Sequence, residues 1–270
     1  MFHFLVIGIG PGDPELVTVK AINALNRADL VLIPRKGDGK TDLAEARREI
    51  CRRYLENETT RLVEFDLPKR GSPRANGYIS SVNNWHDAIA VTYTNLVRQE
   101  LPAGGTVALL VWGDPSLYDS TLRILARMDD VPNFASTVEV IPGVTSLQAL
   151  TAMHRIPLNS LGGSVLYTTG RRLKEGVPAD VDTIVVMLDG EVNFRHLAAE
   201  QFDIYWGACL GLPEEKGYGG RLLGNIERIE QERKRTRENN GWIMDIYILR
   251  RRQIDISKNP IIEKKFSQTH

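Results

Sequence analysis

The stretch "TVALLVWGDPSLYDS", residues 106–120, decides the fold. Its first half is an uninterrupted apolar run, which is typical of a strand buried on both faces of a parallel sheet. Its second half begins with Gly113, Asp114 and Pro115, a turn that brings bare backbone and one carboxylate to the end of that strand. Open parallel sheets bind their ligands at the carboxyl ends of the strands. The stretch therefore predicts both a fold class and the position of a site.

Outward from this stretch, short β-branched runs alternate with amphipathic segments. In the first half, the predicted strands are 4–9, 30–34, 61–66, 106–112 and 138–142, and in the second half they are 164–169, 183–188, 204–210 and 242–249. Predicted helices cover 18–26, with Val19, Ile22 and Leu25 on its buried face, then 42–55, the region of 82–97, and 146–155. Such alternation indicates crossover helices and a parallel sheet. We expect two α/β domains, residues 1–152 and 153–270.

Composition excludes several classes of protein. The chain has 270 residues with 34 basic and 34 acidic side chains, so it lacks the broad positive field of a protein that grips a nucleic acid. Cys51 and Cys209 lie far apart and form no C-x-x-C pair, so we expect two buried thiols, with no disulfide framework and no metal site. The N-terminal stretch lacks the basic region and the long apolar run of a secretory or membrane segment, which favours a cytoplasmic protein.

A glycine motif, "GIGPGDPELVT" at 8–18, follows the first predicted strand. A dinucleotide fingerprint would place its third glycine where this chain has Asp13. The carboxylate would repel a pyrophosphate, and Pro11 removes a backbone donor. NAD binding is therefore disfavoured, and the motif by itself predicts a turn that joins a strand to a helix.

A third motif, "EVIPGVTSLQAL" at 139–150, ends another strand in Pro142 and Gly143 and then offers the hydroxyls of Thr145 and Ser146. By itself this pattern indicates a helix N-cap. Together with "WGDPSLYD", it predicts two neighbouring strand ends that present backbone, hydroxyl and carboxylate groups to one crevice.

The chain resembles the tetrapyrrole (corrin/porphyrin) methyltransferases in a set of motifs that occur in the same order. These motifs are "VIGIGPGDPELVT", "WGDPSLYDST", "EVIPGVTS", "TIVVMLDG" and "LGLPEE". The resemblance covers most of the chain. It implies the tetrapyrrole methylase fold, with a mainly parallel N-terminal sheet and a mixed C-terminal sheet. It also implies a homodimer in which S-adenosylmethionine and a tetrapyrrole meet in the trough between the two domains.

The resemblance also implies the cofactor contacts. They fall on Pro11, Trp112, Gly113, Asp114, Leu117, Thr145, Ser146, Leu188, Leu210 and Trp242. At Leu188 many relatives have Tyr-Met-Gly, where this chain reads Met187, Leu188, Asp189, Gly190. A sulfonium cofactor needs flat apolar walls, backbone hydrogen bonds and an acceptor, and Asp114 with nearby amides suits it.

Within the family, "HRIPLN", "TTGRRL" and "GWIMDIYIL" are similar to the members that methylate C-1 of precorrin-5 and release its acetyl group as acetate in aerobic cobalamin biosynthesis. Two alternatives stay open: another tetrapyrrole methyltransferase, such as a uroporphyrinogen III methyltransferase, and a non-catalytic regulator that binds S-adenosylmethionine. Guanidinium groups suit the carboxylates of such a substrate. The candidate contacts, each of them equally a solvated surface residue, are Arg35, Lys36, Arg74, Tyr118, Arg171 and Arg172.

Release of an acetyl group requires a general base near the site. The candidates are Asp114, His86 and Glu191, with Asp119 as a further possibility. His86 lies in a helical stripe beside Trp85 and is equally compatible with a structural position on the helix. The residues alone do not choose among them, and methyl transfer by in-line displacement requires no metal and no covalent nucleophile.

Overall fold

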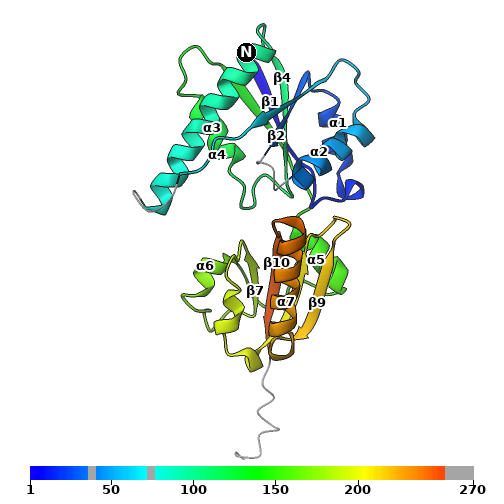
Figure 1. Ribbon diagram of the computed structural model, residues 1–270, viewed down its shortest axis with the longest axis vertical. Coiled ribbons are helices and arrows are strands. Elements are labelled where there is room, and N and C mark those ends of the chain that lie inside the picture. Colours follow the sequence, from blue (N-terminus) through cyan, green and yellow to red (C-terminus); the bar gives the residue numbers. More distant parts are fainter. Residues whose placement is uncertain (36–40, 72–76, 253–270) are drawn as a thin grey trace, which may run out of the picture. The chain divides into compact units, whose positions relative to one another are not determined.

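The computed structural model describes residues 1–35, 41–71 and 77–252 (Figure 1). The chain folds into two compact units. The first contains residues 1–149 with segments 209–216 and 235–243, and the second contains 150–208, 217–234 and the chain from 244 onward. The chain thus passes between the units more than once, and the division at residue 152 stays a prediction.

The first unit is built on a five-stranded parallel sheet of order β3-β2-β4-β1-β5. Its strands are β1 (Phe2–Gly8), β2 (Leu30–Arg35), β3 (Arg61–Asp66), β4 (Gly105–Val111) and β5 (Ser136–Ile141). Its helices are α1 (Val19–Leu25), α2 (Thr41–Tyr54), α3 (Tyr78–Glu100), α4 (Thr121–Met128) and the 3-10 turn Pro14–Leu16. Helices α1 and α2 cover one face, and α3 and α4 cover the other (Figure 1). The predicted strands and the parallel sheet are confirmed.

Both faces of this sheet are buried, which explains why its strands are continuously apolar. Phe4 and Val6 pack with Ile89 of α3, whereas Leu5, between them, packs with Ile50 of α2. Successive side chains of a strand point to opposite faces, so one run of apolar residues supplies two cores.

The buried face of α1 differs from the predicted one. Val19 is 71% exposed, while Ala21, Ala24 and Leu25 form the buried face. Two small side chains and Leu25 supply the buried face of this short helix, which leaves Val19 on its exposed side. The predicted stripe of Val19, Ile22 and Leu25 was therefore wrong at its first position.

The second unit contains a mixed sheet of order β6-β7-β10-β8-β9. Strands β6 and β7 are parallel, and β10 is antiparallel to both of its neighbours, so the expected mixed sheet is confirmed. The strands are β6 (Val165–Thr169), β7 (Thr183–Met187), β8 (Phe202–Ala208), β9 (Lys216–Arg221) and β10 (Asp245–Arg251). The helices are α5 (Ser146–His154), α6 (Gly170–Leu173), α7 (Leu222–Asn240) and the 3-10 turns Asn193–His196 and Ala199–Gln201.

Strand β9 and the long helix α7 are among the elements of this half that were not predicted. Strand β9 is rich in glycine because Gly217 and Gly219 lie against α5: a Cβ at Gly217 would come within 2.2 Å of the Met153 sulfur. Helix α7 buries a stripe that includes Arg233 and Thr236, so its apolar period is hidden in the sequence. Strand β10 begins at Asp245, three residues after the predicted start.

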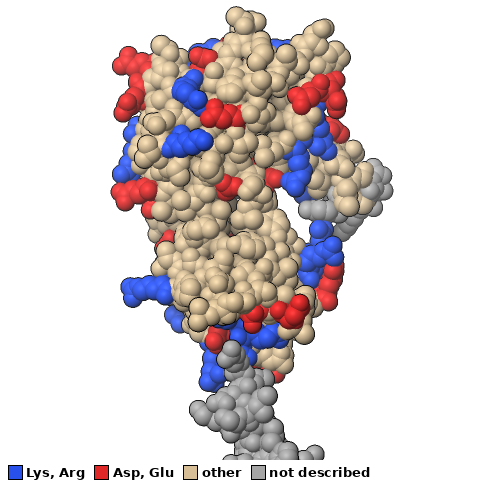
Figure 2. All heavy atoms as spheres, turned by 180° about the vertical axis from the view of Figure 1, so that it is seen from behind, with Lys and Arg blue, Asp and Glu red and all other residues tan. Residues whose placement is uncertain are grey.

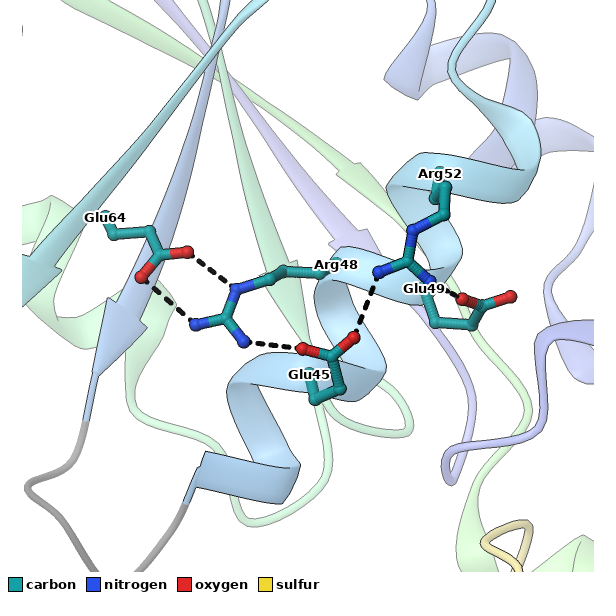
Figure 3. Close-up of polar contacts among 5 residues, drawn as sticks. All are labelled: Glu45, Arg48, Glu49, Arg52 and Glu64. Carbon is teal, nitrogen blue, oxygen red and sulfur yellow. Dashed lines mark hydrogen bonds and ion pairs between the residues drawn. The ribbon is translucent and has the colours of Figure 1, made fainter.

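The surface carries both signs of charge, interspersed on the face drawn in Figure 2. On α2, Arg48 bonds Glu64 of β3 through Nε at 2.6 Å and Glu45 through Nη1 at 2.7 Å, and Arg52 joins Glu45 at 3.0 Å (Figure 3). Such exposed ion pairs contribute little stability. Both cysteines are buried, as predicted. Across the parts of the chain that the structure describes, no helix has the length and apolar content to cross a membrane.

Candidate functional site

Three glycines meet at the carboxyl edge of the parallel sheet, one from the end of each of three neighbouring strands. Gly8 ends β1, while Gly113 and Gly143 follow β4 and β5. A Cβ on Gly143 would lie 2.2 Å from the Gly113 oxygen, and one on Gly8 would lie 2.6 Å from the Gly143 nitrogen. Atoms cannot approach so closely, so these backbones contact each other only because Gly8 and Gly143 carry no Cβ, while Gly113 has a positive φ that glycine adopts easily.

The first glycine loop is joined to the loop after β4 by backbone hydrogen bonds. Gly113 N donates to Gly10 O at 2.8 Å, and Gly10 N donates to Gly113 O at 3.4 Å. Both glycines have positive φ, +81° and +62°. Asp13 accepts from Glu15 N at 2.8 Å and so begins a 3-10 turn. The motif at 8–18 therefore serves the packing of strand ends and forms the predicted turn after the first strand.

The Asp114 carboxylate fastens the turn after β4 to the turn after β5. Its Oδ2 accepts from Gly143 N at 2.9 Å, and its Oδ1 accepts from Ser116 N at 2.8 Å and from the Ser116 hydroxyl. Burial opposes ionisation of this half-buried group, but the hydrogen bonds from Ser116 and Gly143 outweigh it and lower the pKa of Asp114. Asp114 is therefore an anion with both oxygens engaged.

Thr145 begins α5 with a capping box. Its hydroxyl accepts from Leu147 N at 3.2 Å, and Gln148 Oε1 accepts from Thr145 N at 3.0 Å. The Thr145 Cα lies close to Gly113, at 3.6 Å from the position of a Cβ there. The turn after β4 and the start of α5 are thus neighbours, as the two motifs predicted.

The segment 209–216, distant in sequence, lies against the first glycine loop within the first unit. A Cβ on Gly12 would lie 2.7 Å from Leu212 Cδ2 and 3.2 Å from the ring of Trp112. This packing brings Pro11, Trp112 and the segment of Leu210 together. The indole Nε1 of Trp112 is buried with no hydrogen-bond partner among the described residues.

Arg47 of α2 supports this group of residues and was missed by sequence reasoning. It is only 9% exposed, donates from Nε to Leu110 O at 3.0 Å, and holds its guanidinium carbon 5.4 Å from the centre of the Trp112 ring. Burial lowers the pKa of Arg47 to about 10, so it stays charged at neutral pH. Its spacing from buried Ala44 and Cys51 was the available signal, since 44, 47 and 51 share one helix face.

The four candidate bases are distributed over different elements of the two units. Asp114 and Asp119 lie in the loop after β4, and Asp119 accepts from Thr121 N at 2.6 Å. His86 of α3 is 3% exposed, and burial, followed by the charges of Arg127 and Arg123, lowers its pKa. Neither of its ring nitrogens has a partner among the described residues. Glu191 belongs to the second unit, where it is exposed and paired with Lys174.

The remaining candidates fall in several places. Leu117 is half-buried, and Leu188 is exposed in the second unit, whereas Trp242 is buried in the first. Arg35 pairs with Asp66 at 3.1 Å and Arg172 with Glu175 at 2.6 Å, while Arg171 and Tyr118 are exposed. Lys36 and Arg74 lie outside the described residues.

We expect Gly143→Ala to destabilise the protein by about 2–3 kcal/mol, because the new methyl group meets backbone that cannot move aside. Urea denaturation measures the effect. Gly224→Ala is the control, since this exposed glycine of α7 has open space and the substitution should stabilise by up to about 1 kcal/mol. Equal stability of Gly143→Ala and the wild type would contradict the glycine contact.

We also expect Asp114→Asn to flatten the acid limb of the stability curve. A lowered pKa means that the ionised carboxylate stabilises the folded state above the unfolded pKa of about 4, and that this contribution disappears as pH falls through the folded pKa. Unfolding midpoints between about pH 3 and about pH 7 measure it. A variant as acid-sensitive as the wild type would show that the carboxylate is not held by these bonds.

Comparison with known proteins places this chain in a family. The sequence model of the tetrapyrrole (corrin/porphyrin) methylases matches residues 3–219. The chain is 51% identical over 251 residues to precorrin-6A synthase [deacetylating] of Sinorhizobium sp, covering 93% of this chain and 96% of that protein. It is 30% identical to the precorrin-2 C(20)-methyltransferase of the same source, over 68% of this chain and 72% of that one.

Solved structures agree. The crystal structure of a cobalamin synthesis related protein (CobF) from Corynebacterium diphtheriae matches with a TM-score of 0.79 at 35% identity, over 93% of this chain and 99% of that one. The fold is shared with uroporphyrin-III C-methyl transferase from Thermus thermophilus in complex with S-adenyl homocysteine, with a TM-score of 0.53 at 23% identity, over 92% of this chain and 96% of that one. The chain therefore belongs to the tetrapyrrole (corrin/porphyrin) methylases.

Proposed function

We propose that the chain is an S-adenosylmethionine-dependent C-methyltransferase that methylates precorrin-5 at C-1 and releases its acetyl group as acetate, giving precorrin-6A in aerobic cobalamin biosynthesis. The observation that carries the proposal is the 51% identity to a precorrin-6A synthase [deacetylating] along nearly the whole of both chains. We further propose a cytoplasmic homodimer, with the site in a trough between domains 1–152 and 153–270.

The loops at the carboxyl edge of the parallel sheet suit the proposed cofactor. Trp112 and Leu212 offer an apolar wall beside Gly12, and the buried Trp112 Nε1 is a donor with no partner among the described residues. The residues proposed to hold the cofactor are Pro11, Trp112, Gly113, Asp114, Leu117, Thr145, Ser146, Leu188, Leu210 and Trp242. S-adenosylmethionine would supply the methyl group.

Methyl transfer requires that the nucleophilic carbon and the methyl group be held in line at short distance, with water excluded. The protein contributes rigidity to this step. The glycine contact holds the ends of β1, β4 and β5, and Asp114 and Arg47 fasten the turn that carries Trp112 and Gly113. We assign Asp114 this positioning role, because a carboxylate with a lowered pKa and three donors is a weak base.

Loss of the acetyl group needs a different contribution. Water attacks the acetyl carbonyl, and the bond between that carbonyl carbon and C-1 breaks. The electron pair of this bond stays on C-1, which becomes an enamine-like carbon and accepts the methyl group. The acetyl group departs as acetate. The base that takes the proton from water is proposed to be Glu191 or His86. Glu191 is exposed and paired with Lys174, whereas burial lowers the pKa of His86 and so favours its neutral, proton-accepting form.

The substrate carries carboxylates around a macrocycle, so the exposed cations are its proposed contacts. They are Arg35, Arg171 and Arg172, with Tyr118 and, outside the described residues, Lys36 and Arg74. Arg35 and Arg172 each pair with one exposed carboxylate, and exchange of that partner for a substrate carboxylate costs little at the surface.

The assay that tests this function follows both products. With methyl-labelled S-adenosylmethionine and precorrin-5, we expect a labelled corrin precursor and one acetate for each methyl group transferred. Methylation without acetate would reassign the methylated position, and transfer to uroporphyrinogen III instead would assign the chain to an earlier step. Binding of cofactor without any transfer would identify a regulator.

The proposed cofactor site is tested by calorimetry with S-adenosylhomocysteine. We expect Asp114→Asn to weaken binding by about tenfold, since one lost charge-assisted hydrogen bond releases the turn that carries Gly113. Asp66→Asn is the matched control, because it removes an exposed carboxylate of the same unit and should leave the affinity unchanged. Equal affinities of both variants would remove Asp114 from the site.

A further inference from the structure

The turn after β7 contains two strained residues. Leu188 and Val192 have φ values of +54° and +58°, in the left-handed region that glycine adopts easily and other residues rarely adopt. The cost is about 1–3 kcal/mol for each residue, and a β-branched valine is at the high end. Such a turn persists only where its surroundings hold it in place.

Asp189 holds this turn from inside. The residue is 4% exposed, and its carboxylate accepts four hydrogen bonds. Oδ1 accepts from Asn193 Nδ2 at 2.6 Å and Glu191 N at 3.1 Å, and Oδ2 accepts from Asn193 N at 2.7 Å and the Tyr247 hydroxyl at 2.6 Å. Burial and the Asp189 charge raise the pKa of Tyr247, so its hydroxyl remains a donor at all working pH values.

Neighbouring elements of the second unit pack closely around Asp189. A Cβ on Gly170 would lie 2.4 Å from the Asp189 carboxyl carbon, so the glycine after β6 provides the space for the carboxylate. Arg233 of α7 donates to the Asp189 carbonyl and pairs with Asp245 of β10 at 3.0 Å in a buried ion pair. The backbone of the turn is thus tied to two further elements of the same unit.

Leu188 directly precedes the buried Asp189 in this turn. Its side chain is 68% exposed although it is large and apolar. Two unfavourable features therefore coincide at Leu188, a strained backbone and an apolar side chain exposed to water. Burial of the neighbouring carboxylate costs further free energy. Strain of this kind gathers at ligand sites, where the surroundings determine an unfavourable conformation.

We propose that Asp189 is a positioning residue whose buried hydrogen bonds to Asn193 and Tyr247 hold Leu188 in the left-handed conformation, so that the leucine side chain meets the flat conjugated ring of a ligand. The inference rests on the proposed function, in which two ligands carry such a ring: the cofactor through its adenine and the substrate through its macrocycle. Apolar contact with a ring face is the chemistry common to both.

The first test separates strain from function at Leu188. Leu188→Gly removes the strain and the side chain together, so we expect a higher unfolding midpoint than the wild type and an affinity lower by about tenfold. The affected constant identifies the ring: the dissociation constant of S-adenosylhomocysteine for the adenine, or the KM of precorrin-5 for the macrocycle. Leu188→Ala should show the same loss of affinity without the gain in stability.

The second test concerns the anchor. Tyr247→Phe removes one donor to Asp189, and Tyr218→Phe is its control, since it removes a hydroxyl that donates to Glu232 at 3.0 Å in the same unit. We expect both to lower stability and only Tyr247→Phe to raise the same binding constant. In the Leu188→Gly background, Tyr247→Phe should no longer change that constant, because the displayed side chain is gone.

A stabilised Leu188→Gly protein with unchanged affinities for both ligands would overturn the inference, as would equal effects of Tyr247→Phe in the two backgrounds. These outcomes are distinct from failure of the proposed function. If the wild type binds S-adenosylhomocysteine but does not convert precorrin-5, the proposed reaction is wrong and the binding measurements still decide the role of Asp189. If the wild type binds neither ligand, both proposals are wrong.

Discussion

The contact of three backbones at Gly8, Gly113 and Gly143 is the constraint on which the first unit depends. Parallel strands bring their carboxyl ends to one edge, but side chains normally keep the following turns apart. Here the backbones lie at distances that exclude a Cβ at Gly8 and at Gly143. The polar groups that follow, the Asp114 carboxylate and the Thr145 cap, are therefore held against one another by a rigid backbone and not by long side chains.

In the second unit, a carboxylate holds the turn that follows a strand. After β7, Asp189 accepts hydrogen bonds from its own turn and from β10, much as Asp114 accepts from its own turn and from the turn after β5. The two differ in burial. Asp114 is half-buried beside candidate cofactor contacts, whereas Asp189 lies inside the unit and acts through the residue before it.

Rigid positioning suits the chemistry of a methyl transfer. The displacement at sulfur requires no acid, no metal and no covalent enzyme intermediate, so the barrier is lowered mainly by orientation and by exclusion of water. Arg47 is an example of such positioning. This buried cation of α2 contacts the Leu110 carbonyl and the Trp112 ring and so supports the turn after β4. Only the release of acetate calls for a titrating group.

The sequence by itself determined the strands of the first sheet, four of the five strands of the second, the parallel arrangement in the first unit and the family, because each depends on local periodicity or on short motifs. The tertiary structure alone decided what depends on distant partners. It revealed β9, whose glycines leave room for the Met153 side chain. It also revealed α7, whose buried residues include the polar Arg233 and Thr236. It also decided the burial of Arg47 and the left-handed Leu188. The physical reason is that backbone geometry imposes a period on neighbouring residues, whereas a close approach or a buried charge is settled only where distant segments pack together.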